Sequence, residues 1–165
     1  MRKAEVVPWT AKWLELYLEE EDLLRSVFLD ELLEIHHIGS TSVPGIGCAK
    51  PIIDILAVVR DIDKVDDCNE RMMRCGYTPR GENGIAGRRY FTKGGIRRTH
   101  HVHVYEAGHI NIARHLNFKA YLMHHPEEAR AYGELKRRLA REFPDDVRAY
   151  QEGKEDMVAE LVEKP

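Results

Sequence analysis

The chain has 165 residues, 43% of them apolar and 32% charged, which is the ordinary composition of one globular domain with room for a core. Its formal charge of −3 provides no overall attraction to nucleic acid or to an anionic membrane. Three cysteines without CxxC spacing argue against a disulfide framework and a structural zinc site, and no run approaches the ~18 apolar residues of a membrane span, so we expect a cytoplasmic protein.

The first two thirds of the chain show one long helical pattern and then a series of strands. Apolar residues recur at three- and four-residue steps from about Thr10 into the early thirties, which predicts an amphipathic helix. A second helix is expected over residues 64–75, closed by Gly76. Strands are expected over residues 35–38, 51–59, 88–92 and 96–105. The nearly continuous apolar content of residues 51–59 predicts an interior position in a sheet.

From residue 110 the pattern is helical to the end of the chain. Three helices are expected over residues 110–124, 126–142 and 146–162. Pro126 suits a first helical turn, and Asp145 or Asp146 suits the cap of the last helix. Strands in the middle with helices at both ends, and no linker or repeat, predict a single α+β domain over residues 1–165.

A loop rich in glycine, serine and threonine separates the first two strands. Gly39 leaves backbone N–H groups open to an anion because glycine has no Cβ, and the hydroxyls of Ser40, Thr41 and Ser42 add further donors. The loop is therefore a candidate phosphate cradle, although a turn-rich connection alone would also explain its composition.

Two cations are candidates for contacts with the same phosphate. Lys50 precedes Pro51, which favours an extended backbone, so its side chain can reach a phosphate or neutralise Asp54. Arg97 shares, by parity, the side of its strand that carries two histidines. We expect both Lys50 and Arg97 to bind phosphate.

One carboxylate and two histidines are the candidates for chemistry. Asp54 interrupts an apolar strand, where an unpaired carboxylate is costly, so it either pairs with Lys50, an arginine or a histidine, or it binds a metal. His101 and His103 lie on one side of their strand. With Asp54 they could hold a transition metal, relay a proton or contact an anion, and they could equally be a hydrogen-bonded pair that fixes the loop.

The run HIGSTSVPG at residues 37–45, followed by AKPIID at residues 49–54, resembles the GrpB family, and the resemblance extends along nearly the whole chain. That family is placed in the DNA polymerase β-like nucleotidyltransferase superfamily. The resemblance implies a small mixed β-sheet of that type, with an N-terminal helix and a helical C-terminal part. His36 and His37 alternate in direction, so only one can face the site, and we favour His37 as a supporting residue because it lies in the motif.

The resemblance also implies a chemistry. Asp54 would be a catalytic carboxylate that holds a divalent metal, Mg²⁺ or Mn²⁺ with Zn²⁺ as a further candidate, in a metal-dependent nucleotidyltransferase. His101 and His103 stand on the strand where the superfamily carries a third acidic ligand, and from their shared face we expect them to complete the metal site or act as a base. The superfamily motif continues from Gly-Ser to Asp-x-Asp, and here Leu56 stands at the second carboxylate position. The alternative is therefore a non-catalytic binding or partner module that keeps the fold.

Expectations for partners follow from the same resemblance. The ligand would be a nucleotide or another phosphorylated small molecule, and neither a membrane nor nucleic acid is expected as a partner. Family members fused to dephospho-coenzyme A kinase imply an association with coenzyme A biosynthesis.

Overall fold

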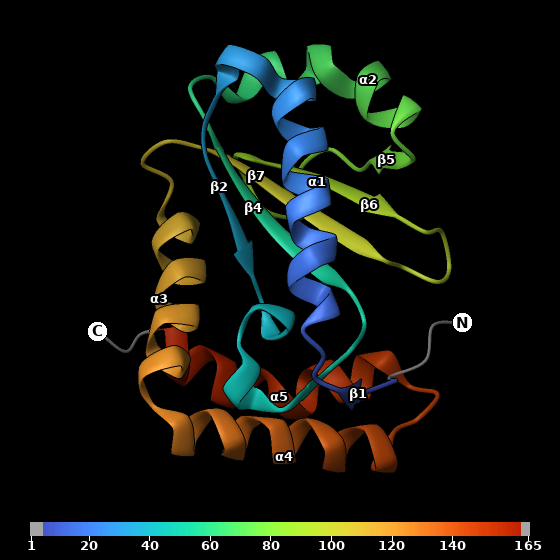
Figure 1. Cartoon of the computed structure of the whole chain (residues 1–165), viewed down its shortest axis with the longest axis vertical. Helices are drawn as coiled ribbons and strands as arrows, with labels where there is room; N and C mark the ends of the chain where they lie inside the picture. The colour runs from blue at the N-terminus through green and yellow to red at the C-terminus, as the bar shows by residue number, and fades with distance from the viewer. Residues whose placement is uncertain (1–4, 163–165) are drawn as a thin grey trace.

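The computed structural model describes residues 5–162, and its centre is a five-stranded mixed sheet (Figure 1). In spatial order the strands are β2 (Leu32–Ile38), β4 (Ile53–Val59), β7 (His100–Glu106), β6 (Arg88–Lys93) and β5 (Tyr77–Pro79). β4 and β7 are parallel, and the other neighbours are antiparallel. β4 is paired on both edges, which confirms its predicted interior position. A separate two-stranded sheet pairs β1 (Val7–Pro8) with β3 (Cys48–Ala49).

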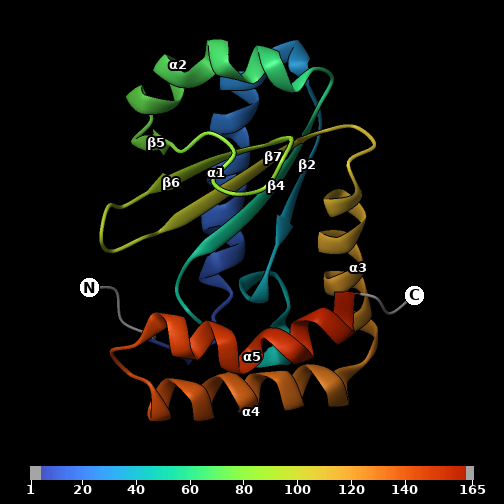
Figure 2. The same cartoon turned by 180° about the vertical axis from the view of Figure 1, so that it is seen from behind.

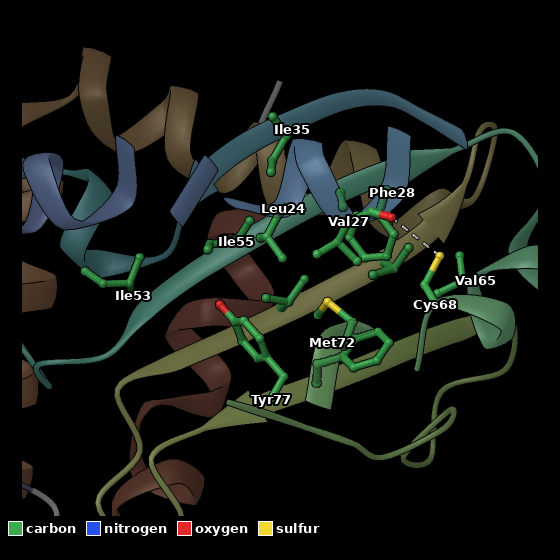
Figure 3. Packing of buried hydrophobic residues seen from close by; sticks show 14 of the residues in the cluster. Leu24, Val27, Phe28, Ile35, Ile53, Ile55, Val65, Cys68, Met72 and Tyr77 are labelled. Carbon is green, nitrogen blue, oxygen red and sulfur yellow. Dashed lines mark hydrogen bonds between the residues drawn. The ribbon is translucent and has the colours of Figure 1, made fainter. Parts of the chain in front are cut away.

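Helix α1 (Lys12–Phe28) covers one face of the five-stranded sheet (Figure 1). Leu24 of this helix packs with Ile55 of β4 and with Met72 of α2 (Asn69–Arg74), inside a cluster of buried apolar side chains (Figure 3). Burial of this apolar surface is the main term that stabilises the domain. Because side chains alternate along a strand, Asp54 lies on the opposite face of β4, which we call the Asp54 face.

Helix α3 (Ile110–His124) covers the Asp54 face near β2, where Ile112 and Leu116 pack against a small apolar cluster of the sheet. Helices α4 (Pro126–Glu142) and α5 (Val147–Val162) lie side by side below the sheet in the view of Figure 1, and Figure 2 shows them from behind. A Cβ at Gly133 of α4 would lie 2.0 Å from the carbonyl oxygen of Ile46, so glycine allows this helix to rest directly on the loop after β2.

The order of the predicted elements agrees with the structure, and several boundaries differ: β2 begins at Leu32 rather than residue 35, β4 begins at Ile53 rather than residue 51, and three larger differences have a clear cause. The helix predicted from Thr10 ends at Phe28, because Leu29 takes a φ of +53° and starts a short 3₁₀ turn into β2. The predicted helix 64–75 is a 3₁₀ segment, Ile62–Cys68, followed by α2. The strand predicted from residue 96 begins at His100, since residues 94–99 form the turn of the hairpin.

The C-terminal helices begin and end within one residue of the prediction, and Asp146 caps α5 through a 3.0 Å hydrogen bond to the N–H of Ala149. Across residues 5–162, no helix combines the length and the apolar content that a membrane crossing needs.

Candidate functional site

Asp54 lies near the start of β4, directly beside the end of β2 and the loop that follows. Ile38, the last residue of β2, pairs with Asp54, and the chain then turns at Gly39 with φ +73° and ψ −175°. A Cβ at residue 39 would lie 2.7 Å from Asp54 Oδ2, so only glycine lets the loop backbone approach the carboxylate this closely. The loop and the carboxylate therefore belong to one site.

The side chains of His101 and His103 reach one oxygen of Asp54. Parallel pairing of β4 with β7 sets His101 beside Asp54 and His103 one step further along the same face. His101 Nδ1 is 3.4 Å and His103 Nε2 is 3.5 Å from Asp54 Oδ1. Burial raises the pKa of Asp54, but hydrogen bonds and positive charge from the two histidines outweigh it and hold the pKa well below its usual range. Asp54 is therefore a carboxylate at neutral pH.

Arg88 on β6 contacts the other ring nitrogen of His103. Arg88 Nη1 lies 3.4 Å from His103 Nδ1, and since a guanidinium only donates, this contact favours the His103 tautomer whose proton is on Nε2, the nitrogen that faces Asp54. Two backbone carbonyls hold the guanidinium in place, at 3.1 and 2.8 Å. On His101, Nδ1 faces Asp54, while the buried Nε2 has no hydrogen-bond partner in residues 5–162.

The residues predicted to hold a metal converge on one oxygen of Asp54. His101 Nδ1 and His103 Nε2 lie 3.4 and 3.5 Å from Asp54 Oδ1, and each nitrogen would have to give up any proton it carries before it could bind a metal. In the described range 5–162, no three His, Cys, Asp or Glu side chains are placed to hold an ion. Leu56, at the second carboxylate position of the superfamily, is buried in an apolar cluster. The divalent metal stays a prediction.

Two cavities meet at Asp54. The larger cavity has a volume of about 720 Å³ and lies between the Asp54 face, α3 and α5, with Arg88 and His115 in its wall. The smaller cavity has a volume of about 120 Å³ and lies between the loop after β2, α4 and α5, with Lys136 in its wall. The residues that line both cavities are Ser40, Asp54, Gln151 and Lys154. Both cavities therefore open onto the loop and the carboxylate.

The three loop hydroxyls differ in what they can bind. Ser42 Oγ donates to the carbonyl of Gly39 at 2.6 Å, and Thr41 Oγ1 contacts His37 Nε2 at 2.9 Å, so both are engaged within the protein. Ser40 also has a side-chain hydrogen bond, with Tyr132, but it lines both cavities. Of the three hydroxyls predicted to bind phosphate, Ser40 is the best placed.

His37 lies on the face of the sheet opposite Asp54. Its ring stacks on Tyr17 of α1 with centroids 4.7 Å apart, and burial lowers its pKa to about 4. The expectation that His37 faces the site is wrong, because β2 pairs with β4 so that Ile38 takes that position. His37 still touches the loop, through Thr41.

The two cations predicted to bind phosphate lie in different places. Lys50 lines the smaller cavity together with Ser40 and Asp54. Arg97 is exposed in the hairpin between β6 and β7 and lines neither cavity. Parity does not apply to Arg97, since it belongs to the turn rather than to the strand.

Sequence reasoning missed the cations that the C-terminal helices bring to the site. Lys136 of α4 is only 3% exposed, and Lys154 of α5 lines both cavities. A signal was present for Lys136, because it lies four residues after Tyr132 and three before Leu139, on the face of α4 that is buried. A lysine within such a stripe needs a partner or a ligand.

Comparison with known sequences gives one family. The sequence signature described as GrpB protein matches residues 3–164. The UPF0157 protein YqkA of Bacillus subtilis (strain 168) is 52% identical over 157 residues, which is 95% of this chain and 46% of that protein. This chain thus spans about half the length of that relative.

Comparison with solved structures places the fold. The crystal structure of conserved protein GrpB from Enterococcus faecalis matches with a TM-score of 0.91 and 41% identity, over 96% of this chain and 94% of that one. The Cid1 poly(U) polymerase matches with a TM-score of 0.55 and 13% identity, over 81% of this chain and 42% of that one. The Cid1 likeness shows the fold alone, and it confirms the predicted α+β fold of the polymerase β-like nucleotidyltransferases.

Proposed function

This chain belongs to the GrpB family, and we propose that it binds a nucleotide or another phosphorylated small molecule in the larger cavity. The observation that carries the proposal is the contact of Gly39 with Asp54 at the junction of the two cavities. Because Gly39 has no Cβ, the backbone N–H groups of the loop stay accessible there, and Ser40 adds a hydroxyl donor beside them.

The size and the wall of the larger cavity suit such a ligand. Its volume of about 720 Å³ falls within the roughly 300–1,000 Å³ of small-molecule sites. Four cations (Arg88, Arg114, Arg148 and Lys154) and three carboxylates (Asp54, Glu152 and Glu155) line it, and Arg148 pairs with Glu152 at 3.0 Å, so the described wall keeps a small excess of positive charge, which attracts phosphates. Phe118 and Tyr105 provide apolar surface for a base or another ring.

Nucleotidyl transfer is the second candidate function. The fold favours it, since Cid1 shares the fold and is described in complex with the UTP analogue UMPNPP. Asp54 is the carboxylate beside the loop, and Leu56 and the two histidine side chains replace the further acidic ligands that the superfamily motif leads one to expect. We therefore rank ligand binding above catalysis, and release of pyrophosphate from a nucleoside triphosphate would reverse that order.

Calorimetric titration of the four common nucleoside triphosphates and of dephospho-coenzyme A, with and without Mg²⁺, tests the binding. Wild type is compared with Gly39→Ala and with Gly95→Ala as the matched control. Both glycines have positive φ, but a Cβ at Gly95 meets no atom within 4 Å. We expect Gly39→Ala to lose about tenfold or more in affinity, the equivalent of one charge-assisted hydrogen bond. If wild type binds none of these ligands, or if the Gly39→Ala variant binds them with equal affinity, the proposal is overturned.

A further inference from the structure

The smaller cavity gathers three lysines from three separate elements. Lys50 comes from the segment before β4, Lys136 from α4 and Lys154 from α5. The ammonium groups of Lys50 and Lys154 lie 4.4 and 5.1 Å from the ring centre of Tyr150. Only tertiary packing brings these three charges together, so the cluster is a feature of the folded site rather than of a local sequence run.

The positive charge in this cavity exceeds the negative charge. Asp54 is the one carboxylate in the wall formed by described residues, and it already accepts contacts from two histidines. Within residues 5–162, Lys136 and Lys154 make no ion pair with a carboxylate. Burial lowers the pKa of Lys136 to about 7 and also lowers the pKa of Lys154, while the carboxylate of Asp54 acts in the opposite direction on both.

Two buried polar atoms in the same wall have no partner. The hydroxyl of Tyr150, a side chain with no exposed surface, makes no hydrogen bond to the described residues, and neither does His101 Nε2. Buried polar groups are normally paired, so two such atoms in one small polar cavity point to a ligand that pairs them.

We propose that the smaller cavity is a binding site for a tetrahedral oxyanion, a phosphate or the terminal phosphoryl group of a larger ligand, held by lysine ammonium groups and the Tyr150 hydroxyl. Lysine binds phosphate as a point charge and needs no bridging cation. The volume of about 120 Å³ is roughly four times the ~30 Å³ share of a liquid water, which is room for one such group. The inference deepens the proposed function and rests on it only where the anion belongs to a nucleotide.

The site predicts that anion binding does not require a divalent metal. The lysines supply the charge that metal ions supply in two-metal phosphate sites. Through Ser40 and Asp54, which line both cavities, an anion here would adjoin a ligand in the larger cavity. A phosphoryl group bound by the lysines could therefore be continuous with a nucleoside bound beside Arg88.

Calorimetric titration of inorganic phosphate and pyrophosphate in the presence of EDTA tests the site. Wild type is compared with Lys136→Met, with Tyr150→Phe and with Lys64→Met, a control at an exposed lysine outside both cavities. We expect loss of about tenfold to a hundredfold in affinity for Lys136→Met and a smaller loss for Tyr150→Phe, with Lys64→Met equal to wild type. Because Tyr150→Phe removes only the hydroxyl and keeps the packed ring, a loss of affinity in this variant is not explained by misfolding.

The outcomes separate this site from the proposed function. No phosphate binding by wild type in EDTA, or equal affinity in Lys136→Met, would overturn the lysine site even if nucleoside triphosphates bind in a Gly39-dependent way. Phosphate binding that depends on Lys136, without any nucleotide binding, would support the lysine site and overturn the nucleotide proposal.

Discussion

Replacing Lys136 with methionine should stabilise the fold while it removes anion affinity. Lys136 is 3% exposed and packs near the ring of Tyr132 at 5.3 Å, so methionine of similar length can fill its place. The substitution removes a buried charge without leaving a buried carboxylate unpaired, since no ion pair joins Lys136 to the described residues. If Lys136 instead stabilised the fold, Lys136→Met would lower the free energy of unfolding.

The magnitude follows from the pKa of Lys136, which burial lowers from 10.5 to about 7. A difference of 3.5 pKa units corresponds to about 5 kcal/mol as an upper limit, and relaxation of the site reduces this to about 1–4 kcal/mol. Below pH 7 the lysine is protonated in both folded and unfolded states, so the stability of the folded state is reduced by the full free-energy cost of burying the charged ammonium group. Between pH 7 and 10.5 the unfolded state binds more protons, so the stability of wild type rises with pH.

Urea unfolding of wild type, Lys136→Met and the control Lys64→Met at pH 6 and pH 9 measures the effect. The stability advantage of Lys136→Met should be largest at pH 6 and smaller at pH 9 by up to ~3 kcal/mol, because wild type has lost the proton on Lys136 by then. Other groups that face Lys136 stay the same in both proteins, namely Cys48, Lys50, Asp54, Tyr150 and Lys154. If Lys136→Met is less stable than wild type, or if its stability advantage does not change with pH, the charge of Lys136 does not destabilise the fold.

Three further predictions concern Asp54 and its histidines. Asp54→Asn removes the carboxylate from the smaller cavity, so phosphate measured in EDTA should bind more tightly, and equal or weaker binding would contradict repulsion of the anion by Asp54. The pKa of Asp54 is lower in the folded than in the unfolded protein, so its carboxylate contributes stability above about pH 4, and this contribution is lost as the pH falls. The free energy of unfolding should therefore be larger for wild type than for Asp54→Asn at pH 7, and the difference should shrink toward pH 2. Titration of Mn²⁺, Zn²⁺ and Mg²⁺ tests the predicted metal site, which should prefer a transition metal because nitrogen ligands suit such ions; no binding by wild type, or equal binding by the His101→Ala/His103→Ala variant, would contradict the site.

The sequence was informative where local pattern decides structure. The periodicity of the C-terminal helices and the apolar run of β4 gave their positions almost to the residue, because each pattern extends over several turns or a whole strand. The strands of two or three residues, β1, β3 and β5, were not predicted, since so short a segment carries no periodic signal.

The site was predictable in part for the same reason. Alternation placed His101 and His103 on one face, and parallel pairing with β4 then brought them to Asp54. The prediction that Arg97 shares the histidine side of its strand failed because Arg97 lies in a turn, where alternation stops. Lys154 was not predicted because its position depends on how α5 docks below the sheet. Contacts between elements far apart in sequence are a property of packing, which a single sequence does not display.

A structure of the protein determined with a bound nucleoside triphosphate tests the central claim most directly. We predict the nucleoside in the larger cavity, phosphate oxygens beside Gly39 and Ser40, and the terminal phosphate within reach of the Lys136 ammonium group. A triphosphate bound elsewhere on the surface, or cavities that stay without ligand at saturating concentration, would contradict it.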